Sequence, residues 1–465
     1  MRRSIFSLFC LLALLVSCKK AQTDTADSVS GRYYANAFAY NIMQSYYLWK
    51  DDIADKVQSW STGEDPIEKV KSVRVSQDRW TRLYDDYTGF EGSVTGTLET
   101  FGLDITAMWA DDSQTRVAGI INYTYADSPA RKAGLKRGDI ILTIDGSDIT
   151  KDNYQQELGK LYSASQVKLG LYSGRDVDLV AVKMYENPVH TVRILQHGGR
   201  KVGYLHFTSF TWDACKDLET TFAQFKAEGI EDLILDLRYN GGGYSFTSTT
   251  LATMIVPSTA IEEGKVFNKD VYNDWLSKEF AEETCFQAEY KLDDKTVIHA
   301  ADVNPGLPRL WVLVSGSTAS AAEALICGLK PYLPVTLIGS QTYGKYCGGV
   351  LVKTAEWFKA LDKEGSSQLD CQEAVRLLPL WGIYVIISRY ADCNGETLSM
   401  PDGIPVDIQA EDKPWDETEL GDPAESMLAV ALQAIDGSAP AAAAVKSSSP
   451  ALLPLRRPGF GVLLH

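Results

Sequence analysis

Histidine is scarce in this chain of 465 residues. It has five histidines, and none of them lies between His299 and His465. A serine nucleophile usually relies on a histidine as its base, so a reactive serine in this part of the chain needs a different partner. The chain also lacks a G-x-S-x-G turn, which disfavours an esterase of the Ser-His-Asp type built on His206.

Basic residues are also in the minority. Lysine and arginine number 45 against 61 aspartates and glutamates, which gives a formal net charge of −16. This balance argues against nucleic acid as a main partner. The eight cysteines include no C-x-x-C pair, so we expect no zinc site. No other metal and no cofactor is predicted. Disulfide pairing is left open.

No stretch of the chain reaches the ~20 apolar residues of a membrane-spanning helix. The N-terminus, MRRSIFSLFCLLALLVSC, has two arginines, a short apolar run and small residues before Cys18, as a signal peptide does. Its ending resembles a bacterial lipobox; a plain secretory signal is the alternative. We therefore expect residues 1–18 to be a lipoprotein signal with lipidation at Cys18. The protein would lie in the cell envelope, on the periplasmic side of a bacterial membrane or at the outer membrane, held by its lipid alone.

Composition and periodicity divide the rest of the chain. Residues 19–31 are polar and are expected to form a tether. Residues 32–88 predict a small helical region, since apolar residues recur at helical spacing and a second helix-like stretch spans 65–87. Residues 437–465 are rich in Ala, Ser and Pro and predict a flexible tail. The first helical stripe consists of Ala35, Phe38, Ile42, Tyr46 and Trp49.

Residues 89–185 change to strand-like patterns. The stretch SPARKAGLKRGDIILTIDG (128–146) predicts a short helix, a turn with glycine and an apolar strand. This block resembles a PDZ domain of the kind found in bacterial proteases. Such domains hold a peptide's carboxylate with loop N–H groups while the peptide adds to the sheet edge. The resemblance assigns this role to FGLDI, where Asp104 has to point away from the carboxylate. Its peptide-binding residues would be Phe101, Gly102, Leu103 and Ile105.

Residues 186–436 alternate strand-like and helix-like segments, which predicts an α/β layer. The segment LILDLRYNGGG (233–243) ends a buried strand with three glycines. Glycines permit a tight turn with exposed backbone N–H groups. Such a turn could supply an oxyanion hole, or it could be purely structural.

The segment VSGSTASAAE (314–323) concentrates hydroxyls at a predicted strand-to-helix junction. Ser320 and Glu323 form the S-x-x-E pattern of a capping box, so Ser320 is either a helix cap or a nucleophile. A nucleophile here would gain from the positive end of the helix dipole, and the next N–H would point at a developing oxyanion. The other hydroxyls of the segment 314–323 are expected to be loop and capping groups; they belong to Ser315, Ser317 and Thr318.

Lys345, in the segment TYGKYCGG, is a candidate base for that serine. A lysine held in an apolar site can lose its proton near neutral pH. Lowering its pKa from ~10.4 to ~7 requires about 4–5 kcal/mol of destabilisation of the ammonium. A solvated surface lysine is the alternative.

Together these motifs resemble the C-terminal processing peptidases, also called tail-specific proteases, which are Ser/Lys endopeptidases with an embedded PDZ domain. TASAAE, TYGK and DLRYNGGG match that family's S-A-S-x-x-E, T-[FY]-G-K and D-L-R-x-N-x-G-G, and the serine and lysine are 25 residues apart. The resemblance implies an α/β fold with a ClpP/crotonase-like core, an inserted PDZ domain and a small N-terminal helical region. It implies Ser320 as nucleophile and Lys345 as general base. It further implies an oxyanion hole from the N–H groups of Ala321 and of Gly242 or Gly243, with Glu323 and Arg238 in supporting roles.

The function implied by the resemblance is a lipid-anchored serine endopeptidase. It would cleave exported proteins at or near their C-termini, which the PDZ domain would capture. Gly349 stands where many family members have a glutamine that orients the lysine, and Pro331 lies near the place of a missing acidic residue. These departures leave a second hypothesis open: a catalytically impaired homologue that binds proteins through its PDZ domain. The apolar C-terminus, GFGVLLH, could also occupy the PDZ groove. Substrate and oligomeric state are left open.

Overall fold

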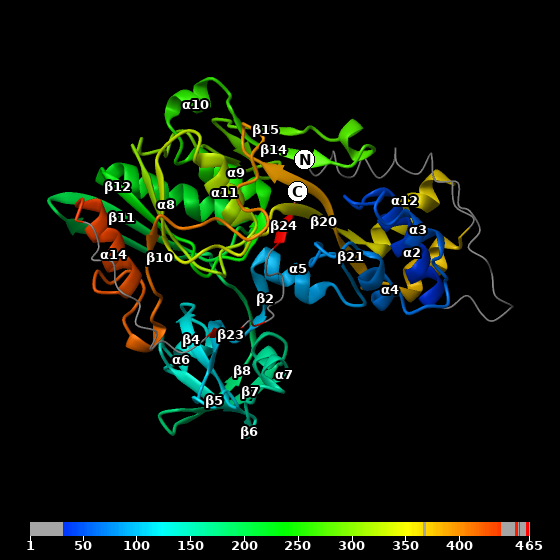
Figure 1. Cartoon of the computed structure of the whole chain (residues 1–465), viewed down its shortest axis with the longest axis horizontal. Coiled ribbons are helices and arrows are strands. Elements are labelled where there is room, and N and C mark those ends of the chain that lie inside the picture. The colour runs from blue at the N-terminus through cyan, green and yellow to red at the C-terminus, as the bar shows by residue number, and fades with distance from the viewer. Residues whose placement is uncertain (1–30, 366–368, 439–451, 454, 456–461, 465) are drawn as a thin grey trace.

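The computed structural model describes residues 31–365, 369–438, 452–453, 455 and 462–464. Figure 1 shows an α/β core on the left, short helices on the right and a smaller unit rich in strands below. The predicted signal, Cys18 and nearly all of the tether lie outside the described residues. No helix within the described ranges is long and apolar enough to cross a membrane.

The short helices on the right pack around aromatic side chains. In the first helix the predicted stripe is confirmed for Ala35, Phe38 and Ile42, which are fully buried. The ring of Phe38 lies 5.5 Å from that of Trp357, which comes from much later in the chain. This unit is therefore built from the N-terminal part of the described chain and from the segment that contains α12 and α13. Its helices are α2 (Gly31–Ser45), α3 (Ala54–Gln58), α4 (Pro66–Val73), α5 (Thr88–Thr95), α12 (Thr354–Glu364) and α13 (Cys371–Leu377).

The second predicted helical stretch is only partly helical. Helix α4 begins after Asp65, whose carboxylate accepts the N–H groups of two first-turn residues, and it ends at Val73. Further on, β1 (Arg82–Tyr84) pairs antiparallel with β21 (Gly382–Ala391). The prediction was therefore wrong over this part, because pairing with a distant strand prevails over a local helical pattern.

The unit below the core is an antiparallel sheet in the order β3-β4-β5-β7-β8, with β6 paired to β5. The chain enters and leaves it through β2 (Thr97–Thr100) and β9 (Val182–Tyr185), which pair with each other. Helix α5 packs into the N-terminal helical core instead, so the unit begins near Thr97 rather than at residue 89. The elements are β3 (Leu103–Trp109), β4 (Val117–Thr124), α6 (Pro129–Lys132), β5 (Ile140–Ile144), β6 (Ser147–Asp148), α7 (Tyr154–Gly159), β7 (Gln166–Leu171) and β8 (Asp176–Val180).

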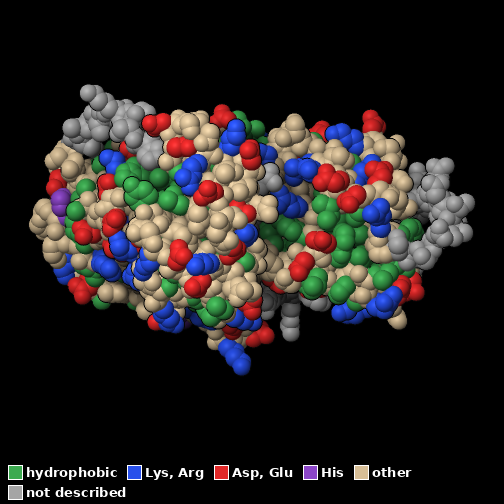
Figure 2. Space-filling view, turned by 90° about the horizontal axis from the view of Figure 1, so that it is seen from below, with side chains coloured by type: hydrophobic (Ala, Val, Ile, Leu, Met, Phe, Trp, Pro, Cys, Tyr) green, Lys and Arg blue, Asp and Glu red, His purple; other side chains and the backbone are tan. Residues whose placement is uncertain are grey.

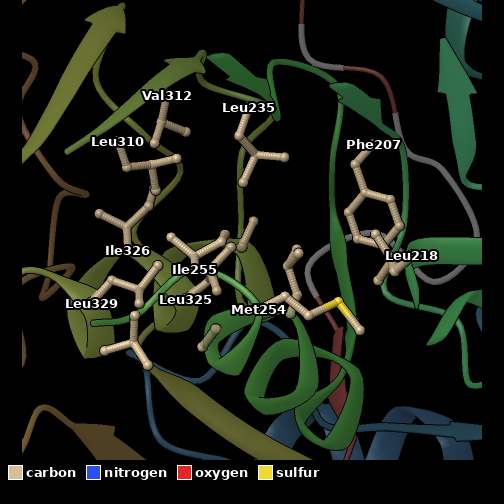
Figure 3. Packing of buried hydrophobic residues seen from close by; sticks show 14 of the residues in the cluster. Phe207, Leu218, Leu235, Met254, Ile255, Leu310, Val312, Leu325, Ile326 and Leu329 are labelled. Atoms are coloured by element: carbon tan, nitrogen blue, oxygen red, sulfur yellow. The ribbon is translucent and has the colours of Figure 1, made fainter. Parts of the chain in front are cut away.

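The core is a six-stranded sheet covered by helices on both faces, which confirms the predicted α/β class. Its order is β10-β11-β12-β18-β19-β22, and all pairs except β10 with β11 are parallel. Leu233 and Leu235 face α8, α9 and α11, while Ile234 faces α14. Figure 3 shows the first of these layers. The elements are β10 (Val189–His197), β11 (Arg200–Phe207), α8 (Ala214–Glu228), β12 (Asp232–Asp236), α9 (Ser245–Thr253), β18 (Leu310–Val314), α11 (Ala321–Leu329), β19 (Val335–Gly339), β22 (Ile408–Gln409) and α14 (Ser426–Ile435).

A second sheet joins the core to the helices, in the order β13-β24-β20-β21-β14-β15. Strand β24 (Val462–Leu464) comes from the C-terminus and lies between β13 and β20. Another C-terminal strand, β23 (Leu452–Leu453), pairs with the outer edge of β3. Most of the predicted flexible tail lies outside the described residues, but these two parts of it are paired as strands. The remaining strands are β13 (Gly242–Tyr244), β14 (Val266–Tyr272), β15 (Glu283–Cys285) and β20 (Cys347–Lys353).

Charge is spread over the surface. On the face seen in Figure 2, acidic and basic side chains are interspersed. Exposed ion pairs of the protein include Arg116 with Asp148, 3.0 Å apart, and Lys168 with Asp176, 2.8 Å apart. Pairs of this kind contribute little to stability, so cohesion between the units has to come from buried contacts.

Candidate active site

The loop before α11 is fastened by two of its hydroxyls. Ser315 Oγ donates to the carbonyl of Arg238, and Thr318 Oγ1 donates to the carbonyl of Leu237 at 2.8 Å. Both bonds hold the loop against the chain that follows β12. The interpretation of these two hydroxyls as loop groups is therefore confirmed.

Ser320, the residue before α11, has a strained backbone. Its φ of 61° and ψ of −113° lie outside the regions that a residue with a Cβ normally adopts, at a cost of about 1–3 kcal/mol. The side chain is fully buried, and its Oγ has no hydrogen-bond partner among the described residues. Among the described residues Ser320 Oγ has no bond to Lys345, while Ser320 and Glu323 form the predicted capping box at the start of α11, in which the N–H of Ser320 donates to Glu323. Strain and an unpaired buried hydroxyl are typical of functional sites.

The carboxylate of Glu323 binds the backbone of both Ser320, the nucleophile candidate, and Lys345, the base candidate. Its Oε2 accepts the N–H groups of Ser320 and Lys345, both at 2.9 Å. Its Oε1 accepts the hydroxyl of Thr342 at 2.6 Å and the N–H of Gly344 at 2.8 Å. Burial raises the pKa of Glu323 to about 7, although the four donors oppose that shift. The supporting role expected of Glu323 is thus to hold the two chain segments in register.

Lys345 is a buried lysine, not a solvated surface charge. Its Nζ donates to the hydroxyl of Tyr384 at 2.9 Å and lies 5.5 Å from the ring centroid of Trp80. Burial lowers the pKa of Lys345 to about 8, against the opposing influence of Cys347, Asp78 and Glu323. A substantial fraction of the amine is therefore neutral near pH 8, as a general base requires.

The glycine turn after β12 offers one of the two expected donors for an oxyanion. The N–H of Gly242 donates to Oδ1 of Asn240 at 2.9 Å, so it is already engaged. Gly243 remains as the glycine for this role, and its φ of 141° is one that L side chains rarely adopt. Ala321 is the first residue of α11, and its N–H therefore lacks an acceptor within the helix.

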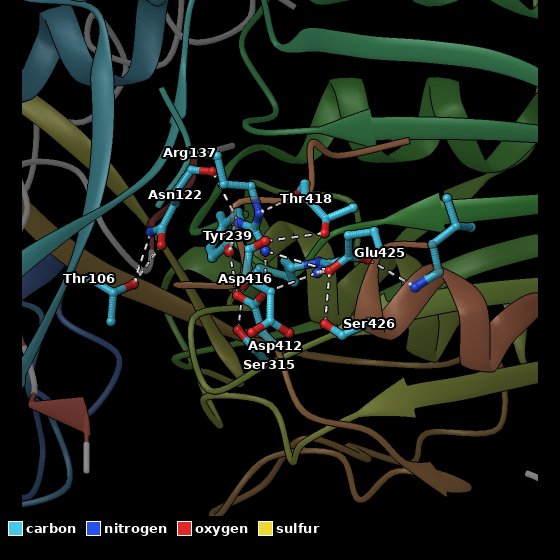
Figure 4. Close-up of polar contacts among 12 residues, drawn as sticks. Thr106, Asn122, Arg137, Tyr239, Ser315, Asp412, Asp416, Thr418, Glu425 and Ser426 are labelled. Atoms are coloured by element: carbon cyan, nitrogen blue, oxygen red, sulfur yellow. Dashed lines mark hydrogen bonds and ion pairs between the residues drawn. The ribbon is translucent and has the colours of Figure 1, made fainter. Parts of the chain in front are cut away.

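Arg238 lies away from the reacting groups. Its guanidinium forms a bidentate pair with Glu425, with N–O distances of 2.7 and 2.9 Å, and also pairs with Asp236. Figure 4 shows this buried network reaching Arg137 of the lower unit, which binds Asp412 at 2.6 Å. The side chain of Arg238 thus joins the core to the lower unit. Only its carbonyl, through Ser315, holds the loop before Ser320.

The predicted peptide-binding loop sits at the start of β3. Phe101, Leu103 and Ile105 are buried in the core of the unit, and Gly102 has a φ of 70°. The N–H of Gly102 donates to the hydroxyl of Thr100 at 2.9 Å, so it is already engaged in this structure. The side chain of Asp104 accepts a hydrogen bond from Asn122 at 2.7 Å and lies next to β4.

His206 gives no support to an esterase mechanism. Its Nδ1 lies 3.1 Å from Nδ1 of His190, and aromatic rings surround the pair. Burial lowers the pKa of His206 well below its usual range. Among the described contacts, neither nitrogen of its ring bonds to Ser320.

Three residues near Lys345 were missed by sequence reasoning. Trp80 and Asp78 come from the N-terminal unit, and Tyr384 comes from β21. None of them lies in a recognisable motif. Spacing along the chain holds no signal for these contacts, which bridge 39 residues for Tyr384 and more than 200 for Asp78 and Trp80. Among the described cysteines, free thiols are present at Cys215, Cys285, Cys327, Cys347 and Cys393.

Comparison with known proteins agrees with this geometry. Residues 201–410 match the model of peptidase family S41, and residues 120–168 match that of the PDZ domain. The chain is 29% identical over 340 residues to the carboxy-terminal processing protease CtpA of Bacillus subtilis, covering 65% of this chain and 67% of that protein. It is 28% identical over 275 residues to a carboxyl-terminal-processing protease of Synechocystis, covering 57% and 58%. The chain thus spans roughly three fifths to two thirds of the length of these relatives.

A solved structure shows the same fold. It is the crystal structure of a Bacteroides fragilis protein assigned to the S41 proteases, with a TM-score of 0.64, 20% identity and coverage of 89% of this chain and 99% of that one. The mixed α/β fold with an S41 peptidase core and a PDZ domain is therefore established.

Proposed function

We propose that this chain, a serine-type peptidase of family S41 with a PDZ domain, is an endopeptidase that uses Ser320 as nucleophile and Lys345 as general base. The observation that carries this proposal is the buried amine of Lys345, whose described contacts are a hydroxyl and two aromatic rings. Glu323 holds this amine's chain segment beside that of Ser320. A buried lysine with a lowered pKa can serve as a general base, and strongly perturbed ionisable groups cluster at functional sites.

The chemistry follows from these groups. Neutral Lys345 takes the proton of Ser320 Oγ as the oxygen attacks the carbonyl carbon of the scissile peptide bond. The N–H groups of Ala321 and Gly243 stabilise the resulting oxyanion. The ammonium then protonates the leaving amine, and the amine of Lys345 activates a water that hydrolyses the acyl-enzyme. The hydroxyl of Ser320, which has no described partner here, has to approach the amine before the first step, while Lys345 Nζ stays bound to Tyr384.

The substrate would be an exported protein captured by its C-terminus at the PDZ domain. The outer edge of β3 already pairs with an extended segment, which supports strand addition at this edge. Matched peptides with a free or an amidated C-terminus would test this capture. We expect the free acid to be cleaved at lower concentration, since amidation removes the terminal charge.

Anchoring would be by lipid at Cys18. Replacing Cys18 with serine in the producing bacterium should release the protein from the membrane fraction. An unchanged membrane fraction would remove the lipid from the proposal and leave the peptidase assignment untouched.

The peptidase assignment is tested by Ser320→Ala and Lys345→Ala. Each should abolish peptide cleavage, while the melting temperature stays within a few degrees of the parent. Cleavage that survives in both variants would overturn the dyad. The alternative is a protein that only binds partners through its PDZ domain, and the lack of a bond between Ser320 Oγ and Lys345 is compatible with it. Labelling of Ser320 by a fluorophosphonate probe would rule out this alternative.

A further inference from the structure

Gly349 has no room for a side chain. A Cβ at this position would lie 2.4 Å from the carbonyl oxygen of Val385 and 2.9 Å from Cζ of Tyr384. Strands β20 and β21 pair here with an irregularity between Gly348 and Gly349. The glutamine expected at 349 is therefore excluded by the backbone and by a tyrosine ring on the neighbouring strand.

Tyr384, whose ring excludes a side chain at 349, also contacts the amine of Lys345. We propose that Tyr384 positions the amine of Lys345, in place of the glutamine that the family resemblance puts at 349. The hydroxyl of Tyr384 accepts from Lys345 Nζ at 2.9 Å, and its ring centroid lies 5.1 Å from that nitrogen. This role rests on the proposed function, in which Lys345 is the base.

The Tyr384 side chain is well suited to fixing an amine. It is 2% exposed, its ring centroid lies 5.3 Å from that of Phe90, and its backbone is paired on both sides with β20 and β1. A neutral amine has two N–H groups and one lone pair. With one N–H held by Tyr384, the lone pair stays available for the proton of Ser320. The other ionisable groups that influence this amine are Cys347, Asp78 and Glu323.

Tyr384→Phe is the sharpest test, because it keeps the ring against Gly349 and removes only the oxygen. We expect kcat to fall about 10- to 100-fold, with KM nearly unchanged. The ascending limb of the pH–kcat profile should move to lower pH, because the ammonium loses an acceptor. Tyr290→Phe is the matched control: its hydroxyl is also buried and bonded, to Thr253, but it has no contact with Lys345.

The outcomes separate a positioning role from a structural one. A fall in kcat without a shift of the pH limb would overturn the proposal in favour of a structural role, and so would an unchanged kcat. If Ser320→Ala or Lys345→Ala stays active, the dyad itself fails. If both are inactive and Tyr384→Phe behaves like the parent, only the role of Tyr384 fails.

The C-terminal strand β24 carries an independent inference. It lies in a slot between β13, which contains Gly243, and β20, which starts two residues after Lys345. Leu464 pairs with Tyr244 on one side and with Gly349 on the other. An extended segment in this slot is therefore flanked by the oxyanion strand and by the strand that follows the base.

We infer that residues 462–464 occupy the strand position of the substrate, so that the chain competes with its own substrates. Residues 452–453 pair with the edge of β3 at the same time, and Leu453 and Leu455 pack against the PDZ core. A tethered segment has an effective concentration of about 1 mM. Free peptide of the same sequence should then bind poorly to the intact chain.

Binding of a fluorescent peptide with the sequence of residues 452–465 tests this inference. The protein is the full chain with Ser320→Ala, so that the result does not depend on catalysis. Adding Leu463→Pro, which removes one N–H from the ladder, should tighten peptide binding at least about tenfold. Leu463→Val keeps that N–H and is the matched control.

Comparison of further variants decides whether the competing contact is that of residues 462–464 between β13 and β20 or that of residues 452–453 at the edge of β3. Equal affinity of the Leu463→Pro and Leu463→Val chains would overturn the inference. Tightening by Leu453→Pro alone would place the competition at the β3 edge and would likewise overturn the assignment to the slot. Tightening by Leu463→Pro supports it.

Discussion

The N–H of Lys345 donates to Oε2 of Glu323 at 2.9 Å. This single bond joins the loop of the base to the helix of the nucleophile. The same oxygen accepts the N–H of Ser320, so one buried carboxylate determines the separation of the two segments. Any change at Glu323 should therefore affect stability and catalysis together.

Glu323→Ala should lower both the stability of the protein and its rate of catalysis. It leaves three backbone N–H groups and the hydroxyl of Thr342 without their acceptor in a buried site. Each such group costs about 1–3 kcal/mol, so we expect a loss of at least about 3 kcal/mol and a large fall in kcat. Thermal melting and peptide hydrolysis would measure the two effects. Glu323→Gln should be intermediate, since its amide keeps one accepting oxygen. A fully stable Glu323→Ala chain would contradict this account.

Activity should rise with pH through about 8. The pKa of Lys345 is lowered to about 8 by burial, and only the neutral amine can accept the proton of Ser320. Below that pH the rate should fall about tenfold per unit, because the neutral fraction does so. A pH–rate profile of kcat checks the limb. Lys345→Arg should be inactive at every pH, since arginine does not lose its proton in proteins.

Glu323, whose burial raises its pKa to about 7, titrates in the same range. The control is therefore the profile of Glu323→Gln. Its limb should persist at a lower plateau and move below pH 8, because the variant lacks a carboxylate that raises the pKa of Lys345. Disappearance of that limb would assign the titration to Glu323 instead.

The sequence predicted the parts of the site that lie within short motifs. Ser320, Glu323 and Lys345 were identified because each motif spans a strand and its following turn or helix, where local spacing determines position. Tyr384 and Trp80 were not, because they reach Lys345 only through pairing of β21 and packing of the N-terminal unit. The obstacle to a side chain at Gly349, which includes the ring of Tyr384 on the next strand, is a tertiary contact and has no signal in the local sequence.

Gly102→Ala should destabilise the PDZ unit. The φ of Gly102 is 70°, and a Cβ there would lie 2.3 Å from Cβ of Ser128. Strain and overlap together should cost about 2 kcal/mol or more. Gly174→Ala is the control, since φ is 81° there but no atom lies within 4 Å of the added Cβ. Limited proteolysis of the full chain should cut the Gly102→Ala unit sooner than that of the control. Equal rates would mean that the crowding at Ser128 relaxes.

Two bidentate arginine–glutamate pairs should differ in their effect on stability. Arg238 binds Glu425 in the buried network, and Arg376 binds Glu373 on the surface. Arg238→Ala leaves buried Asp236 without its arginine and leaves Glu425 with Arg137 at 3.5 Å, and should cost about 3 kcal/mol or more. Arg376→Ala should have little measurable effect.

Low pH should destabilise the protein through the buried pair of Arg238 and Glu425. Although burial opposes it, Arg238 holds the pKa of Glu425 at about 2, below its usual value of about 4.3. The stability from this pair is therefore complete above about pH 5 and is lost as the pH falls toward 2. Melting temperatures measured from pH 7 to pH 3 should fall less steeply for Arg238→Ala than for the parent, because the variant has already lost this contribution. Parallel curves would show that the pair does not govern acid stability.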